Sequence, residues 1–173
     1  MSFAAHFNTG TGLPALPVRE GPHPRWHRLP HGGATDLLIL LAQKHPQQSV
    51  GVIVNSTDTQ FSLLRSLERR ALRLKPQTCT YRARAPKGRY RTLDLDRPGI
   101  VLVHRASARG LGFDTVVIPD THTDSAVDLT SAALRMTYCM LATRARRDLH
   151  LAYEGETEPP LCAQVGPGDL LRG

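Results

Sequence analysis

The stretch GIVLVHRASARGLGFDTVVIPD (99–120) holds two apolar runs joined by a short connection rich in glycine and other small residues. The runs GIVLVHR (99–105) and DTVVIPD (114–120) are dense in β-branched residues, as is SVGVIVNS (49–56) upstream. Continuous runs of this kind are typical of strands that are buried on both faces, and such strands form parallel sheets covered by helices. The chain is therefore predicted to have an α/β fold.

Helical patterns alternate with these strands. GGATDLLILLAQKH (32–45) predicts a helix with Thr35 or Asp36 as its N-cap and Pro46 just beyond its end. The other predicted helices are an amphipathic one in 57–72 and a long one over 125–147, with Ser125 or Asp128 near its start. The arrangement predicts a three-layer domain with a mainly parallel sheet and helices on both faces.

The remaining segments set the expected domain boundaries. Residues 1–24 contain glycine, proline and few periodic apolar residues, and they are predicted to form a loose lead-in to a domain over 25–153. Residues 154–173 are rich in glycine and proline and are expected to be a flexible tail. Further predicted strands are a short edge strand at 25–29, two short strands around a Pro-Lys-Gly turn in 78–96, and a final strand at 148–153.

Composition restricts the function classes. The 173 residues carry a formal charge of +7 and a pI near 9.9, which favours an anionic partner such as nucleic acid or nucleotide phosphates, although a basic solvated surface explains the same numbers. The three cysteines, Cys79, Cys139 and Cys162, have no metal-site spacing and suggest reduced thiols in the cytoplasm, and no metal site is expected. We see no signal peptide, and the longest apolar run, at 37–42, is too short to span a bilayer, so no membrane partner is expected.

Ligands of parallel sheets bind where strands end, so the connection after His104 is the first candidate site. Gly110 and Gly112 allow a sharp turn or a close approach to a ligand, and Ser107 and the loop amides can donate hydrogen bonds to phosphate. Arg105 and Arg109 add positive charge. An ordinary connection between strands would have the same composition.

The second candidate is YCMLATRARRDLHLAY (138–153), which places Thr143, Arg144, Arg146 and Arg147 at the end of the predicted long helix. Cations at that end can simply complement the helix dipole. A planar guanidinium beside a buried strand can also reach a phosphate in a cleft.

Together these stretches resemble motifs V and VI of superfamily-one DNA helicases of the UvrD/Rep type. The counterparts are ARGLGFDTVVIP (108–119) and YCMLATRARRDLHL (138–151), and the segment at 49–70 resembles the motif IV strand and helix. The three segments occur in the family's order and cover roughly residues 49–153.

The resemblance implies the second, C-terminal RecA-like domain of a helicase. In the family this domain faces ATP across a cleft, and its motif V loop couples the nucleotide to single-stranded DNA. Arg144 matches the motif VI arginine finger that reaches the γ-phosphate, and it is the expected catalytic residue. Gly110 and Gly112 are expected beside the nucleotide. The DNA-binding residues implied are His104, Arg105, Ser107, Arg109 and Thr143, and the family suggests 3′ to 5′ unwinding.

The sequence departs from the family at several positions. The motif V glutamate, associated with the nucleotide sugar, falls on Gly112, and the loop threonine and histidine fall on His104 and Ala106. A motif IV arginine, a second phosphate contact, falls on Asn55. The motif VI tyrosine falls on Cys139, next to Tyr138.

The sequence contains no G-x-x-x-x-G-K-[ST] phosphate loop, and none of its three lysines, Lys44, Lys75 and Lys87, lies in one. Phosphoryl transfer needs that loop, its lysine and a metal. ATP and Mg²⁺ are therefore expected only together with an ATP-binding RecA-like domain, in cis or in trans, and not with this chain alone.

Two other functions stay open. A binding module derived from a helicase domain would hold DNA or a protein without any nucleotide role, and an arginine belt between Arg65 and Arg91, with Tyr81 and Tyr90 interleaved, would suit single strands. A small hydrolase using His122 and the carboxylates of Asp114, Asp120 and Asp124 lacks both a nucleophile elbow and metal-ligand spacing.

Overall fold

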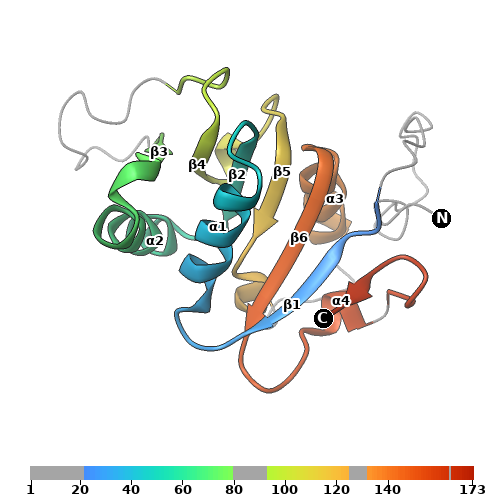
Figure 1. Ribbon diagram of the computed structural model, residues 1–173. Coiled ribbons are helices and arrows are strands. Elements are labelled where there is room, and N and C mark those ends of the chain that lie inside the picture. Colours follow the sequence, from blue (N-terminus) through green and yellow to red (C-terminus); the bar gives the residue numbers. More distant parts are fainter. Residues whose placement is uncertain (1–21, 80–92, 125–131, 164) are drawn as a thin grey trace.

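The computed structural model describes residues 22–79, 93–124, 132–163 and 165–173 (Figure 1). The helices are α1 (Gly33–Lys44), α2 (Thr57–Arg70), α3 (Ala132–Ala142) and α4 (Pro160–Ala163), with short 3-10 turns at Leu72–Leu74, Arg105–Ser107 and Thr121–Asp124. The strands are β1 (Arg25–Leu29), β2 (Ser49–Val54), β3 (Gln77–Thr78), β4 (Gly99–His104), β5 (Phe113–Ile118), β6 (Ala145–Glu154) and β7 (Leu171–Arg172).

The described strands form one seven-stranded sheet in the order β3-β4-β2-β5-β6-β1-β7, and every described strand pair is parallel. The β-branched run in β2 lies at the centre, between β4 and β5, and all six of its residues are buried. The predicted α/β class with a parallel sheet is confirmed.

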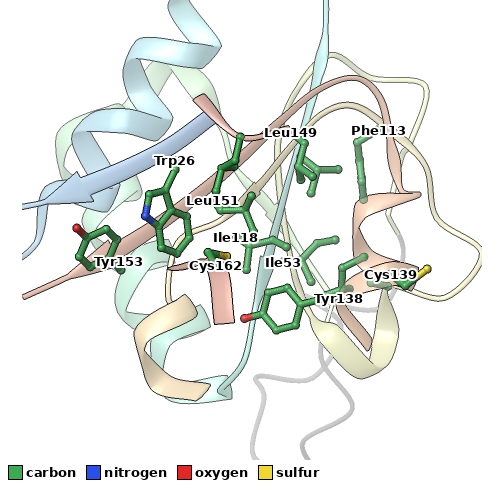
Figure 2. Close-up of a cluster of buried hydrophobic side chains, with 14 of the residues drawn as sticks. Trp26, Ile53, Phe113, Ile118, Tyr138, Cys139, Leu149, Leu151, Tyr153 and Cys162 are labelled. Carbon is green, nitrogen blue, oxygen red and sulfur yellow. The ribbon is translucent and has the colours of Figure 1, made fainter. Parts of the chain in front are cut away.

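Helices cover both faces of the sheet (Figure 1). On one face, α1 and α2 pack Leu38 and Leu64 against Val52 and Leu102 of the strands. On the other face, Tyr138 of α3 packs with Ile53, Phe113 and Leu151, as Figure 2 shows. Leu149, Leu151 and Tyr153 of β6 point to the α3 face, and the alternating residues His150 and Ala152 are buried too, so β6 is covered on both faces here.

The boundary between α3 and β6 differs from the prediction. The sequence pattern predicts a long helix up to residue 147, but α3 ends at Ala142 and β6 begins at Ala145. The Phe113 N–H donates to the Arg144 carbonyl at 3.0 Å, so pairing with β5 has already begun where the sequence pattern still favours helix. Arg144 therefore lies in the turn, and Arg146 and Arg147 lie on a strand and not on a helix end.

The segment after Glu154 also differs from the expected flexible tail. It contains α4 and β7, and β7 pairs with β1, so β1 is not an edge strand. Cys162, Val165 and Leu170 are buried in the cluster around Trp26, whose ring stacks on Tyr153 with centroids 5.0 Å apart (Figure 2). Apolar side chains spaced among glycines and prolines are enough to dock this segment onto the sheet.

Smaller differences concern caps and turns. The N-cap of α1 is Gly32, with a left-handed φ of 74°, while Thr35 and Asp36 lie inside the helix. Most of the predicted strand pair in 78–96 and the predicted helix start at Ser125 or Asp128 lie outside the described residues.

Candidate functional site

The connection between β4 and β5, residues 105–112, runs from the carboxyl ends of the strands to their amino ends. We call these two sides of the sheet the carboxyl edge and the amino edge. Both strands pair in parallel with β2, so the chain leaves β4 at the carboxyl edge and must return to the amino edge before β5 starts. Ala108 is fully buried against the α3 face and anchors the connection midway, and Gly110 turns it with a left-handed φ of 79°. The two ends of this connection define two candidate sites.

At the amino edge, Arg144 is half-buried and touches the end of the connection. Its Nη1 donates to the Leu111 carbonyl at 3.3 Å, its Nε to the Met140 carbonyl at 3.2 Å and its Nη2 to the Thr143 hydroxyl at 3.0 Å. A guanidinium has five N–H groups, so one on each terminal nitrogen is left for a ligand. Arg144 and Gly112 are thus brought to the same edge.

Two more arginines lie at this edge. A Cβ built on Gly112 would be 3.3 Å from Nε of Arg146, so the Arg146 side chain covers that glycine. Arg147 lies 4.0 Å from the carboxylate of Asp114, which also accepts hydrogen bonds from the backbone and hydroxyl of Ser49. These two hydrogen bonds, together with the nearby arginines, lower the pKa of Asp114, although partial burial opposes them.

At the carboxyl edge, two predicted DNA-binding residues are engaged inside the protein. His104 directs Nε2 to the Asn55 carbonyl at 2.9 Å and accepts the Ala106 N–H at Nδ1, which defines the tautomer protonated on Nε2. Nη1 of Arg105 donates to both Asn55 and Asp124. His104 and part of Arg105 therefore hold the strand ends together.

Asp124 is the centre of this polar network. It is buried and accepts hydrogen bonds from the Tyr138 hydroxyl at 2.8 Å and the Asn55 amide at 2.9 Å, in addition to its ion pair with Arg105. The sequence analysis considered Asp124 only as a carboxylate of a small hydrolase and did not assign this role. The signal that could have found it is the pair of aspartates, Asp120 and Asp124, that follows the apolar run VVIP (116–119).

The predicted DNA-binding set is divided between the edges. Thr143 lies beside Arg144 at the amino edge, with its hydroxyl donating to the Met140 carbonyl, whereas His104 and Arg105 lie at the carboxyl edge. Arg109 is exposed, and neither its side chain nor that of Ser107 makes a hydrogen bond within the described part of the chain. Ser107 and Arg109 are therefore the members of the set that are free to meet a ligand.

Asn55 lies far from Arg144. Its N–H donates to Asp120, whereas the Arg144 carbonyl accepts from Phe113, at the other end of β5. At about 3.3 Å per residue, the seven residues from Phe113 to Asp120 separate the edges by roughly 20 Å. A residue at position 55 therefore cannot share one phosphate with Arg144, so this departure from the family pattern leaves the amino edge intact.

Asp120 is a buried titratable group of the carboxyl edge whose pKa departs from its ordinary value. It is 3% exposed, and its Oδ1 has no hydrogen-bond partner within the described residues. Burial raises its pKa from 3.8 to about 6, although the Asn55 N–H opposes that shift. The folded protein therefore holds this proton more tightly than the unfolded chain does.

We expect the variant Asp120→Asn to change the pH dependence of stability. With the folded pKa above the unfolded one, wild type loses stability as pH rises from about 4 to about 6, and the loss is complete above pH 6. Since one pKa unit corresponds to about 1.4 kcal/mol, the stability difference between variant and wild type should move in the variant's favour by on the order of 2 kcal/mol between pH 4.5 and 7.5.

Urea unfolding at several pH values measures this difference. His150, whose pKa burial lowers to about 4, contributes a slope of opposite sign, which cancels between variant and wild type. Asp114→Asn is the control, because the lowered pKa of Asp114 keeps that carboxyl ionised in both states over this range. A stability difference for Asp120→Asn that does not vary with pH would contradict the prediction.

Other features of the described residues bear on the site. No group of three or more His, Cys, Asp and Glu side chains within them could hold a metal ion. In the same residues, none of the helices combines the length and the apolar character that crossing a membrane requires. A pocket of about 710 Å³ lies at the carboxyl ends of β1 and β6, between Arg28, His31, His122 and Glu154, and no residue predicted to bind nucleotide or DNA lines it.

The parallel sheet, its covering helices and the connection that reaches both edges define an α/β domain of the RecA-like type. Among solved structures, the chain is similar to the C-terminal domain of a possible DNA helicase from Lactobacillus plantarum WCFS1, with a TM-score of 0.66 and 19% identity over 91% of this chain and 89% of that one.

Domains of the DEAD-box protein Dbp5 have the same fold. S. cerevisiae Dbp5 bound to RNA and ADP BeF3 gives a TM-score of 0.60 at 15% identity and covers 88% of this chain, which matches 41% of that one. The separate C-terminal domain of Dbp5 gives 0.55 at 14% identity, over 88% of this chain and 89% of that one. No family model matches the sequence, and no curated protein matches it.

Proposed function

We propose that this chain is the second RecA-like domain of an ATP-dependent DNA helicase of the UvrD/Rep type. In this proposal Arg144 is the arginine finger, Gly110 and Gly112 lie beside the nucleotide, and the connection after β4 contacts single-stranded DNA. The ATP and its Mg²⁺ are bound mainly by a separate ATP-binding RecA-like domain, because this sequence has no phosphate loop.

The observation that carries the proposal is the contact between Arg144 and Leu111. It joins the arginine to a connection whose other end lies at the carboxyl edge, beside Arg105 and Asn55. One short segment therefore touches both candidate sites, which suits a domain that must relate nucleotide state to DNA contact. The similarity in fold to helicase C-terminal domains supports the same assignment, and the three free cysteines agree with a reducing compartment such as the cytoplasm.

The test is stimulation of an ATPase. The ATP-binding RecA-like domain encoded in the same or the neighbouring reading frame is assayed with single-stranded DNA, with and without this chain. We expect hydrolysis only when both parts are present, since phosphoryl transfer needs the phosphate loop and the arginine together. Hydrolysis that does not respond to this chain would contradict the proposal.

We expect the chain to bind a labelled single-stranded oligonucleotide with strong salt dependence. Each phosphate contact contributes about −0.7 to the log–log slope of affinity against salt, so six contacts would give about −4. Arg109 is an exposed charge of the connection without a partner among the described residues. The variant Arg109→Gln should make the slope shallower by about 0.7. Fluorescence anisotropy at several salt concentrations measures both quantities.

Arg25→Gln is the matched control for this experiment, because it removes one exposed positive charge at the amino end of β1. It should leave the slope nearly unchanged. Equal effects of the two variants would mean that DNA binding depends only on the net charge of the protein. That result would contradict the proposed contact between the connection and DNA.

A second candidate function is a nucleic-acid or protein binding module without a nucleotide role. The absence of a side chain at Gly112 favours it, since the family's sugar-associated carboxylate is missing there. Such a module would bind the oligonucleotide as described but would not stimulate any ATP-binding domain. The ATPase assay therefore separates the two functions.

A further inference from the structure

Gly112 has no conformational reason to be glycine. The glycines of the described residues with positive φ are Gly32, Gly99, Gly110 and Gly155, so the backbone at Gly112 is one that other residues adopt readily. The reason lies in its surroundings, because the Nε and Nη2 atoms of Arg146 lie 3.3 Å and 3.5 Å from where a Cβ would be. A side chain at this position would make the Arg146 guanidinium shift by a few tenths of an ångström, whereas glycine leaves it in place.

Arg146 also lies at an irregularity of the sheet. Phe113 pairs with Ala145, but Thr115 pairs with Asp148, so β6 contains one extra residue at Arg146 and Arg147. Bulges are rare between parallel strands, and they re-aim side chains near functional sites. This one presents two neighbouring arginines at the amino edge.

The two arginines differ in their contacts, although the charges of both lower the pKa of Asp114, that of Arg147 more. Arg147 lies within ion-pair distance of Asp114, which is already held by Ser49. Arg146 is exposed, and within the described residues its guanidinium makes no hydrogen bond or ion pair. Its donors are therefore available next to Gly112, at the end of the connection that Arg144 also contacts through Leu111.

We propose that Arg146 is a second phosphate-contacting residue of the amino edge and that Gly112 leaves the space it occupies. This inference rests on the proposed function and gives an individual role to Arg146, which the sequence pattern named only as one of several arginines in its second candidate stretch. Arg146 takes the position where the resembling family has a sugar-associated carboxylate. The edge then offers positive charge from both Arg144 and Arg146, which suits an oligophosphate with several anionic oxygens.

The test uses the whole chain and inorganic tripolyphosphate, with binding followed by calorimetry. Arg146→Gln should weaken binding about five- to tenfold, the size expected when one exposed charge-assisted hydrogen bond is lost. Gly112→Glu should weaken it at least as much, because the new carboxylate would pair with Arg146. Arg147→Gln is the matched control and should change affinity less than about twofold, since Asp114 already offsets that charge.

Three results would overturn the inference: unchanged affinity in Arg146→Gln, an equal loss in Arg147→Gln, or no saturable binding of tripolyphosphate by wild type. The helicase proposal is judged separately by the ATPase assay. Full stimulation by Arg146→Gln with unchanged tripolyphosphate affinity would remove the role of Arg146 and leave the helicase assignment intact. Tripolyphosphate binding that depends on Arg146, without any stimulation of the ATPase, would support the role of Arg146 and contradict the helicase assignment.

Discussion

Under the proposed function, replacing Arg144 with alanine is expected to abolish the stimulation of an ATP-binding partner domain, with a loss of about 10³- to 10⁵-fold in turnover, the size of effect that an arginine finger has. The N–H groups that remain on its two terminal nitrogens can face a transferring phosphoryl group while the others hold Leu111 and Met140. Arg144→Lys should fail almost as completely, because an ammonium cannot contact both carbonyls and a phosphate in one plane.

Steady-state ATP hydrolysis with saturating DNA and partner domain measures this effect. Arg147→Ala is the control, because it removes a neighbouring exposed charge that lies toward Asp114. Circular dichroism and thermal unfolding separate a catalytic loss from an unfolded variant, since Arg144 also ties the end of α3 to the connection. A folded Arg144→Ala variant that stimulates as wild type does would contradict the assignment.

The strands at the centre of the sheet could be predicted from the sequence, because a strand that is buried on both faces is a nearly continuous run of apolar residues. The runs in β2, β4 and β5 are apolar at nearly every position, and each of them became a parallel strand. The single tryptophan, Trp26, is buried and its ring stacks on Tyr153. For the apolar strands and for this tryptophan, the type of amino acid is enough to predict that the side chains are buried.

The boundary between α3 and β6 could not be predicted in the same way. Alanine and arginine both favour helix, so the run TRARR continues the helical pattern of the preceding residues. The bond from Phe113 to the Arg144 carbonyl overrides that preference, and it joins residues that are distant in sequence. The bulge at Arg146 likewise depends on the register with β5, which a local pattern does not encode.

The roles of the candidate site residues stay predictions, but the structure does give their arrangement. Arg144 contacts Leu111, the neighbour of Gly112, while His104 and Thr143 lie at opposite edges. A motif fixes the order of residues along the chain. It does not reveal that His104 and Arg105 are occupied by Asn55 and Asp124, because those partners come from other strand ends.

Substituting Gly51 with alanine is expected to destabilise the fold, because among the described glycines an added Cβ would make its shortest contact here. A Cβ at this position would be 2.1 Å from Cδ2 and 2.3 Å from Cγ of the Phe113 ring. That ring is 1% exposed and packed in the cluster of Figure 2, so it cannot move away without opening the core. Overpacking of this kind costs about 1–3 kcal/mol, and sometimes more.

The size and sign of this effect can be checked with a double-mutant cycle. Since about 1 kcal/mol shifts the melting temperature of a domain of this size by roughly 2–4 °C, Gly51→Ala alone should melt several degrees below wild type. In a Phe113→Ala background the same change should be neutral or stabilising, because alanine has the better strand propensity once the ring is gone. If the loss of stability persists without the Phe113 ring, the clash with that ring is not its cause.

Because the Phe113 N–H holds the Arg144 carbonyl, a ring displaced by the added methyl group should also reduce ATPase stimulation in variants that remain folded.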